Sequence, residues 1–125
     1  MKAYGRVERK HRIGLLIAAL KSGDFKQGRG ALREVDKFCC LGVACEVYRR
    51  ENPQAKRTWH TNGSSIRSLF LQQTITLPLE VIEWYGFDES DPMITVGSED
   101  GHASDLNDSG CTFDQIARGF EGMIE

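Results

Sequence analysis

Cysteine is the residue type in this sequence that could take part in the most kinds of chemistry: metal binding, disulfide formation or nucleophilic attack. Three lie close together, at Cys39, Cys40 and Cys45, and the fourth is Cys111. Structural zinc sites favour ligands two to four residues apart, whereas Cys39 and Cys40 are adjacent and would point about 100° apart on a helix. Adjacent cysteines without an export signal also argue against disulfides. We therefore predict no metal site and no cofactor.

A cysteine nucleophile would need a lowered pKa and a base close by. Cys39 or Cys40 would lie near the start of a helix, where the helix dipole favours the thiolate, and His102 is the candidate base. The positions of the histidines in the sequence give no reason to expect any of them beside a cysteine. They are His11, His60 and His102. The preferred prediction names no catalytic residue, and a small cysteine-dependent enzyme remains the alternative.

The element that must hold these cysteines is the densest apolar run of the chain, residues 36–48. From Leu41 onward its apolar residues recur at the spacing of one helical face, at Ala44, Cys45, Val47 and Tyr48. Free cysteine behaves as a small hydrophobe in such a setting. We predict a central buried helix with reduced thiols, capped by Asp36 and ended by Asn52 before a proline.

A second helix is predicted near the N-terminus, over residues 10–21. Its apolar residues follow helical periodicity, Lys21 suits the negative end of the helix dipole, and Gly23 suits the stop. Residues 1–9 are mixed in character and are expected to be loosely ordered.

Two more helices have clear end signals. Residues 78–85 lie between Pro78, which is typical of a first helical turn, and Gly86, which is typical of the position after the last. Thr112 and Gln115 match a capping box that begins a C-terminal helix.

The remaining segments predict short strands and loops. Residues 31–35 and 93–96 have the composition of strands. Residues 66–73 favour a helix over a strand, while residues 53–65 and 97–111 are predicted loops. The expected fold is α+β, a single compact domain of about four helices with a small, short-stranded sheet over residues 1–125.

The length, net charge and apolar content are those of an ordinary globular chain. It has 125 residues, a net charge of −2 and no apolar run approaching the roughly 20 residues of a membrane span. This balance gives no general attraction to nucleic acid, although a basic cluster at residues 6–12 keeps a nucleic-acid-binding accessory protein as a further alternative. We expect no membrane association, and the sequence does not determine the oligomeric state.

Four residues are candidates for binding a ligand: Arg29, Arg33, Trp59 and Asn107. Arg29 lies between two glycines, the one place where backbone amides and a cation coincide as in phosphate sites. Trp59 lies in a polar loop, where it either anchors a partner as an exposed ring or packs onto the core, and packing is the preferred interpretation. Asn107, together with Asp108, either contacts a ligand or braces the loop backbone, and bracing is the preferred interpretation.

Several short motifs are found together along most of the chain. They are Leu20-Lys21-Ser22-Gly23, Phe38-Cys39-Cys40-Leu41-Gly42-Val43, Leu77-Pro78 with Val81, Trp84, Gly86 and Phe87, Leu106-Asn107-Asp108, Thr112-Phe113 and Ile116-Ala117. In these motifs the chain resembles a recurrent type of small protein encoded by tailed bacteriophages and prophages, with a Cys-Cys-Leu-Gly-Val core and a Leu-Asn-Asp loop. The resemblance implies an accessory protein acting in the cytoplasm of the bacterial host.

The expected function is therefore non-catalytic. The chain would bind a host protein or sequester a small anionic, nucleotide-like ligand, and so counteract host defence. This expectation follows from genome setting by analogy, since fold and motif do not by themselves imply a function.

Overall fold

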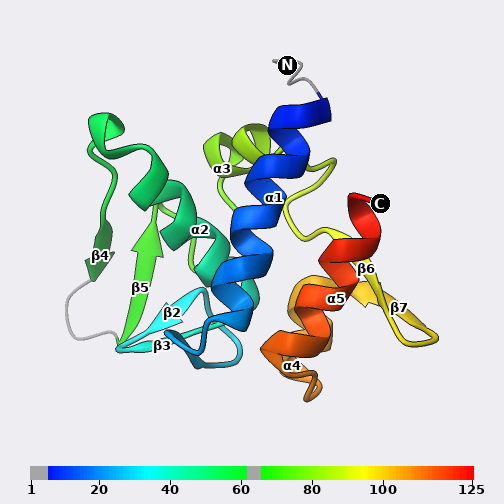
Figure 1. Ribbon diagram of the computed structural model, residues 1–125. Helices are drawn as coiled ribbons and strands as arrows, with labels where there is room; N and C mark the ends of the chain where they lie inside the picture. Colours follow the sequence, from blue (N-terminus) through cyan, green and yellow to red (C-terminus); the bar gives the residue numbers. More distant parts are fainter. Residues whose placement is uncertain (1–5, 62–65) are drawn as a thin grey trace.

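The computed structural model describes residues 6–61 and 66–125, and it confirms the α+β prediction (Figure 1). Within these residues, four helices have seven residues or more and a fifth is shorter. A five-stranded sheet and a two-stranded hairpin complete the fold. Among the described residues, none of the helices combines the length and the apolar character that a bilayer crossing requires.

Helix α2 (Cys40–Glu51) is the central element, and each of its residues from Cys40 to Tyr48 is buried. The prediction of a buried central helix is confirmed. The prediction that Asp36 caps it is wrong, because residues 37 and 38 are held in a strand and the helix cannot begin until after Cys39. Gly42 allows a close approach, since a Cβ atom there would lie 1.7 Å from the carbonyl oxygen of Leu32.

The larger sheet has the strand order β1-β3-β2-β5-β4, so β1 and β4 are its edges. Its strands are β1 (Lys26–Gln27), β2 (Arg33–Glu34), β3 (Lys37–Phe38), β4 (Trp59–Thr61) and β5 (Arg67–Phe70). Strands β1 and β3 are parallel, and the other three pairs are antiparallel. A short 3-10 helix, η1 (Pro53–Ala55), follows α2 within the segment predicted as a loop.

Strand β5 corrects the preferred prediction of a helix over residues 66–73. Ser68 and Phe70 are buried and Arg67 is exposed, which is the alternation of a strand. The strand pairs with β2 on one side and β4 on the other. Neither pairing is visible in the local sequence, so the tertiary context decided against the helical spacing.

Residues 97–111 correct a second prediction, because they are not a loop throughout. Strand β7 (Glu99–His102) pairs with the predicted strand β6 (Met93–Val96), and helix α4 (Ala103–Asp108) follows it directly. The carboxylate of Asp91 accepts hydrogen bonds from the backbone N–H and the hydroxyl of Ser104. A carboxylate 13 positions upstream thus supplies the start signal that the helix lacks locally.

The remaining helices agree with their predicted end signals except at Pro78, which was predicted in the first turn and instead has extended backbone angles at the N-cap position. Helix α3 (Leu79–Tyr85) ends at Gly86, whose φ is 78°. Helix α5 (Phe113–Met123) begins with the predicted capping box, in which Thr112 and Gln115 bond each other's backbone N–H groups.

Helix α1 (Arg6–Lys21) starts four residues before its predicted beginning. The expectation of loose order is therefore wrong for residues 6–9, and residues 1–5 lie outside the described residues. Part of the reason is that Arg9 reaches a distant carbonyl, since its Nε donates to the oxygen of Gly86 at 3.1 Å. Helix α1 packs against both α2 and α5 (Figure 1).

A series of aromatic rings connects the sheet to the core between the helices. Neighbouring ring centroids along it are 4.8–6.4 Å apart, mostly in edge-to-face or tilted contact. In order, the rings are those of Phe25, Phe38, Trp59, Phe70, Tyr48, Trp84, Tyr85, Phe87 and Phe120. The outer end of the series, at Phe25, Phe38 and Trp59, is thereby supported from the interior.

Candidate binding site around Trp59

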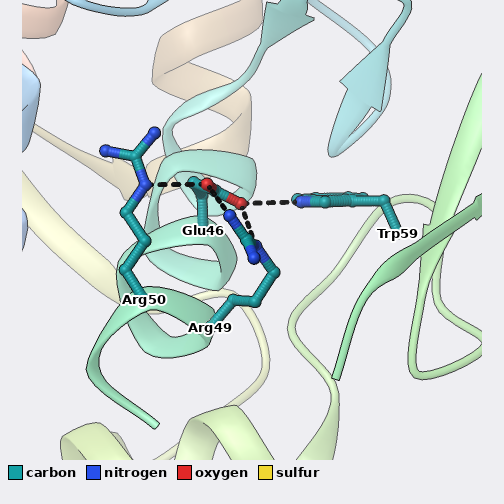
Figure 2. Close-up of polar contacts among 4 residues, drawn as sticks. All are labelled: Glu46, Arg49, Arg50 and Trp59. Atoms are coloured by element: carbon teal, nitrogen blue, oxygen red, sulfur yellow. Dashed lines mark hydrogen bonds and ion pairs between the residues drawn. The ribbon is translucent and has the colours of Figure 1, made fainter. Parts of the chain in front are cut away.

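A carboxylate almost withdrawn from solvent lies at the centre of the candidate site. Glu46 is 5 % exposed and accepts four hydrogen bonds (Figure 2). Arg49 donates through Nε and Nη2 at 2.8 Å each, Arg50 through Nε at 2.8 Å, and the indole Nε1 of Trp59 at 2.9 Å. One side chain thus joins α2 to the edge strand β4.

The pKa of Glu46 reflects two opposing effects. Burial raises it, because the charged form loses hydration, but hydrogen bonds from Arg49, Trp59 and Arg50 together lower it to about 2. The carboxylate is therefore ionised at neutral pH. Because all its hydrogen-bond partners are donors within the fold, we assign it a positioning role and no role as a proton-transfer group.

Helical spacing explains half of this cluster. Arg49 and Arg50 follow Glu46 by three and four residues, so all three lie on one side of α2. Trp59 arrives from β4, where it is paired with Phe70 of β5. Sequence reasoning missed Glu46, Arg49 and Arg50, although the i, i+3, i+4 pattern of opposite charges was a usable signal.

Two arginines lie over the outer end of the aromatic series. The guanidinium carbon of Arg33 is 4.9 Å from the ring centroid of Phe38 and 5.6 Å from that of Trp59. The guanidinium carbon of Arg50 is 5.2 Å from the ring centroid of Phe25. These are cation–π distances. We call these five residues the arginine–aromatic face.

Beside this face the sheet is hollowed. A depression of about 460 Å³ is lined by Arg33, Val35, Trp59, Thr61, Ile66 and Ser68, and we call it the Trp59 hollow. Ser68 of β5 pairs with both Arg33 of β2 and Thr61 of β4, so three strands contribute to it. Val35 and Ile66 are 64 % and 59 % exposed, which adds two apolar side chains to its lining.

Val35 has a backbone conformation that its residue type disfavours. It is the first residue of the two-residue turn between β2 and β3, and its φ is 58°. A β-branched residue at positive φ is an outlier, since glycine or asparagine is usual in such turns. The sequence alone did not reveal this, because the pairing that closes the turn had to be known first.

Of the four predicted ligand residues, the structure brings two together. Arg33 and Trp59 both line the Trp59 hollow. Arg29 lines a different depression of about 300 Å³ together with Gly28 and Lys37. The backbone amides near Arg29 are already bonded, that of Gly28 to a carbonyl of β3 and that of Gly30 to the carboxylate of Asp108. This turn is therefore not a free phosphate-binding loop.

A family model described as a domain of unknown function, DUF8296, matches residues 10–123. The chain belongs to the DUF8296 family. No curated protein and no solved structure matches it significantly. The DUF8296 region extends from within α1 to the last residue of α5, so it includes the whole candidate site.

Asn107 has a structural role in the DUF8296 domain, and its predicted contact with a ligand is corrected. Its side chain is fully buried. Its oxygen accepts from the backbone N–H of Cys40 at 3.2 Å and from Nε2 of Gln27 at 2.9 Å, and its nitrogen donates to the carbonyl of Gly28 at 2.8 Å. The preferred interpretation, bracing of the backbone, is confirmed. Asn107 also caps the start of α2, which connects the Leu-Asn-Asp and Cys-Cys motifs.

The cysteines of the DUF8296 domain are packed as predicted. Cys39, Cys40 and Cys45 are free and buried. Burial raises the pKa of Cys39 to about 11, and it raises the pKa of Cys40 and of Cys45 well above the ordinary value. These thiols are protonated at neutral pH, which is the opposite of what a nucleophile requires.

His102, the candidate base for a cysteine, is engaged elsewhere. Its Nδ1 lies 2.6 Å from the carbonyl oxygen of Asp91 and 3.3 Å from a carboxylate oxygen of Glu89. The hydrogen bond to the Asp91 backbone raises the pKa of His102. Cys40 instead donates to the carbonyl oxygen of Ala103 at 3.5 Å. The geometry thus gives no support to a cysteine–histidine pair.

Proposed function

We propose that this DUF8296 protein is a non-catalytic accessory protein that captures a partner protein through the Trp59 hollow. The observation that carries the proposal is Val35. A non-glycine residue at positive φ costs on the order of 1–3 kcal/mol. The side chain is 64 % exposed, so packing inside the fold does not repay that cost. Strain maintained for an exposed apolar side chain is typical of a contact surface.

The shape and composition of the hollow suit a protein partner. It is a depression on a sheet, and two of the side chains in its lining, Val35 and Ile66, are exposed and apolar. Trp59 and Arg33 are residue types that dominate binding energy at protein interfaces, and Ile66 adds a second exposed apolar side chain. A protruding apolar side chain of the partner would fill the hollow.

The charge near the hollow indicates the chemistry of the partner. Among the described residues that line the hollow, only Arg33 is charged, and none of the described carboxylates forms an ion pair with it. Complementarity of charge speeds association and selects partners. The partner would therefore present an acidic group beside its apolar anchor. Nucleic acid has no such apolar anchor, so it is the weaker candidate.

The resemblance to phage-encoded proteins supports a bacterial setting. In that setting the partner is a host protein of the bacterial cytoplasm, and its capture would counteract host defence. The cysteine-dependent alternative loses support because the three clustered thiols are buried and protonated.

The proposal is tested by replacing the strained residue. Val35→Gly removes the apolar side chain and relieves the strain, so the variant should melt at or above the temperature of the wild type while losing the partner. Ile66→Ser should also lose it. Leu79→Ser is the matched control, because Leu79 is 68 % exposed on α3. Tagged proteins would be incubated in a bacterial lysate, and retained proteins quantified by mass spectrometry.

The expected result is one host protein retained by the wild type and by Leu79→Ser and lost by both hollow variants. Retention of the same protein by Val35→Gly at the wild-type level would refute the proposed surface.

A further inference from the structure

We infer that the arginine–aromatic face binds the phosphate group of a small nucleotide-like molecule between Arg33 and Arg50. This goes beyond capture of a partner protein and depends on a different residue, Arg50.

Arg50 is anchored at one nitrogen of its guanidinium. Its Nε donates to Oε2 of Glu46 at 2.8 Å, and its terminal nitrogens point away from that carboxylate (Figure 2). Arg49 donates to both oxygens of Glu46. Since Arg49 already balances the charge of Glu46, the positive charge of Arg50 is available to another anion.

Arg33 is anchored in the same manner. Its Nε donates to the carbonyl oxygen of Val35 at 2.8 Å. It has no carboxylate partner among the residues that the structure describes. Its guanidinium is held over Phe38 and Trp59. A guanidinium fixed in this way loses little conformational entropy when it binds a ligand.

The two guanidinium groups lie over rings that touch. Arg33 is over Phe38, Arg50 is over Phe25, and the centroids of these two rings are 5.2 Å apart. The two rings meet edge to face at 84°, so the guanidiniums from β2 and α2 lie over ring faces that are nearly perpendicular to each other. The apolar rings below them lower the local polarity and strengthen an ion pair made above.

Phosphate fits this arrangement better than carboxylate does. A phosphate monoester has three terminal oxygens and a charge approaching −2, so it can accept from two guanidinium forks at once. A carboxylate has two oxygens and one charge. The adjoining hollow of about 460 Å³, which Arg33 and Trp59 both line, lies in the usual size range for small organic groups and can receive a planar base.

The test is calorimetric titration of the full chain with inorganic phosphate, AMP and ADP. We expect AMP or ADP to bind with a dissociation constant on the order of 1 mM or lower, and inorganic phosphate to bind more weakly. Arg50→Gln should weaken nucleotide binding by about tenfold or more, because it removes a charged hydrogen-bonding fork. Arg50→Lys keeps the charge without the fork and should fall in between.

Arg118→Gln is the matched control, since Arg118 is an exposed arginine of α5 outside the site. It should bind nucleotide as the wild type does, and melting curves would establish that each variant is folded. Absence of binding by the wild type would overturn the inference, as would equal weakening by Arg118→Gln and Arg50→Gln. Equal affinity for inorganic phosphate and AMP would overturn the nucleotide assignment.

The two proposals can fail separately. Arg50→Gln should still capture the partner protein. Val35 lines the hollow that would receive the base, so the separate test with Val35→Gly uses inorganic phosphate, whose binding should be kept because glycine retains the backbone carbonyl that anchors Arg33. Loss of both functions in both variants would show that the surface had rearranged, and it would overturn the assignment of separate roles.

Discussion

Two buried polar side chains form hydrogen-bond networks at helix α2, and the two networks have opposite consequences. Asn107 meets the helix at its start, where its partners are the backbone of Cys40 and Gly28 and the amide of Gln27. Glu46 lies within the helix, where its partners are two arginines and an indole. Around Asn107 the network is enclosed, whereas around Glu46 the donors Arg49 and Arg50 still reach solvent.

The difference shows how a buried polar group can serve structure or function. An enclosed network with every group bonded specifies one packing arrangement and offers nothing to a ligand. A network that ends in partly exposed guanidiniums fixes them in place and leaves donors available. We therefore expect perturbations at Asn107 to act on folding, and perturbations around Glu46 to act mainly on the surface.

The largest effect is expected from Asn107→Leu. The substitution removes the acceptor of the buried N–H of Cys40, one of the two acceptors of the Gln27 amide, and a donor to the carbonyl of Gly28. The free energy of unfolding should fall by about 3–4 kcal/mol, as measured by urea denaturation.

Asp108→Asn serves as the control for Asn107→Leu, because the new side chain keeps an oxygen that can accept from the N–H of Gly30 and from Nδ2 of Asn107. If Asn107→Leu were as stable as Asp108→Asn, the comparison between an enclosed and an open network would fail.

A somewhat smaller effect is expected from Gly42→Ala, which tests the packing of the same enclosed region. The added Cβ would meet the carbonyl oxygen of Leu32 at 1.7 Å, so the backbone must shift at a cost of about 2–3 kcal/mol. Gly14→Ala in α1 is the matched control, because no atom lies within 4 Å of the new Cβ. That variant should be unchanged or up to about 1 kcal/mol more stable. If the Gly42→Ala variant were as stable as the wild type, α2 and Leu32 would be packed less tightly than in this structure.

The smallest effect is expected from Glu46, and it depends on pH. The pKa of Glu46 is lower in the folded chain, at about 2, than its ordinary value of 4.5. Its stabilisation is therefore present above pH 4.5 and is lost as the pH falls toward 2. We expect a loss of about 2 kcal/mol, less than the full shift implies, because the arginine partners are partly exposed.

The measurement is the free energy of unfolding of the wild type and of Glu46→Gln at several pH values between 5 and about 2. The difference between the two proteins should shrink as the pH is lowered. A difference that stays constant would mean that the charge of Glu46 does not contribute to stability. The contrast drawn between the Glu46 network and the Asn107 network would then fail.

Local signals in the sequence were sufficient for several elements. The capping box of Thr112 and Gln115 and the stop at Gly86 lie within or beside their helices, so they could be recognised without a partner. Strand β5 could not, because its helical spacing was overruled by pairing with β2 and β4. Helix α4 was missed because its cap, Asp91, lies in another segment.

The candidate site shows the same division. Arg33 and Trp59 were predicted as ligand residues from their types and setting, and they do lie together. The strain at Val35 was not predictable, because it arises from the closure of a turn between paired strands. Asn107 was placed among the ligand residues, yet its partners come from segments up to 80 positions away and enclose it.

The sequence by itself determined the α+β class, the buried cysteine helix and most helix ends, because these depend on periodicity and on neighbours within one turn. The tertiary structure alone decided which polar groups are enclosed and which remain available to a ligand. That choice depends on contacts between segments distant in the chain, such as those that place Trp59 against Glu46 and Asn107 against Cys40.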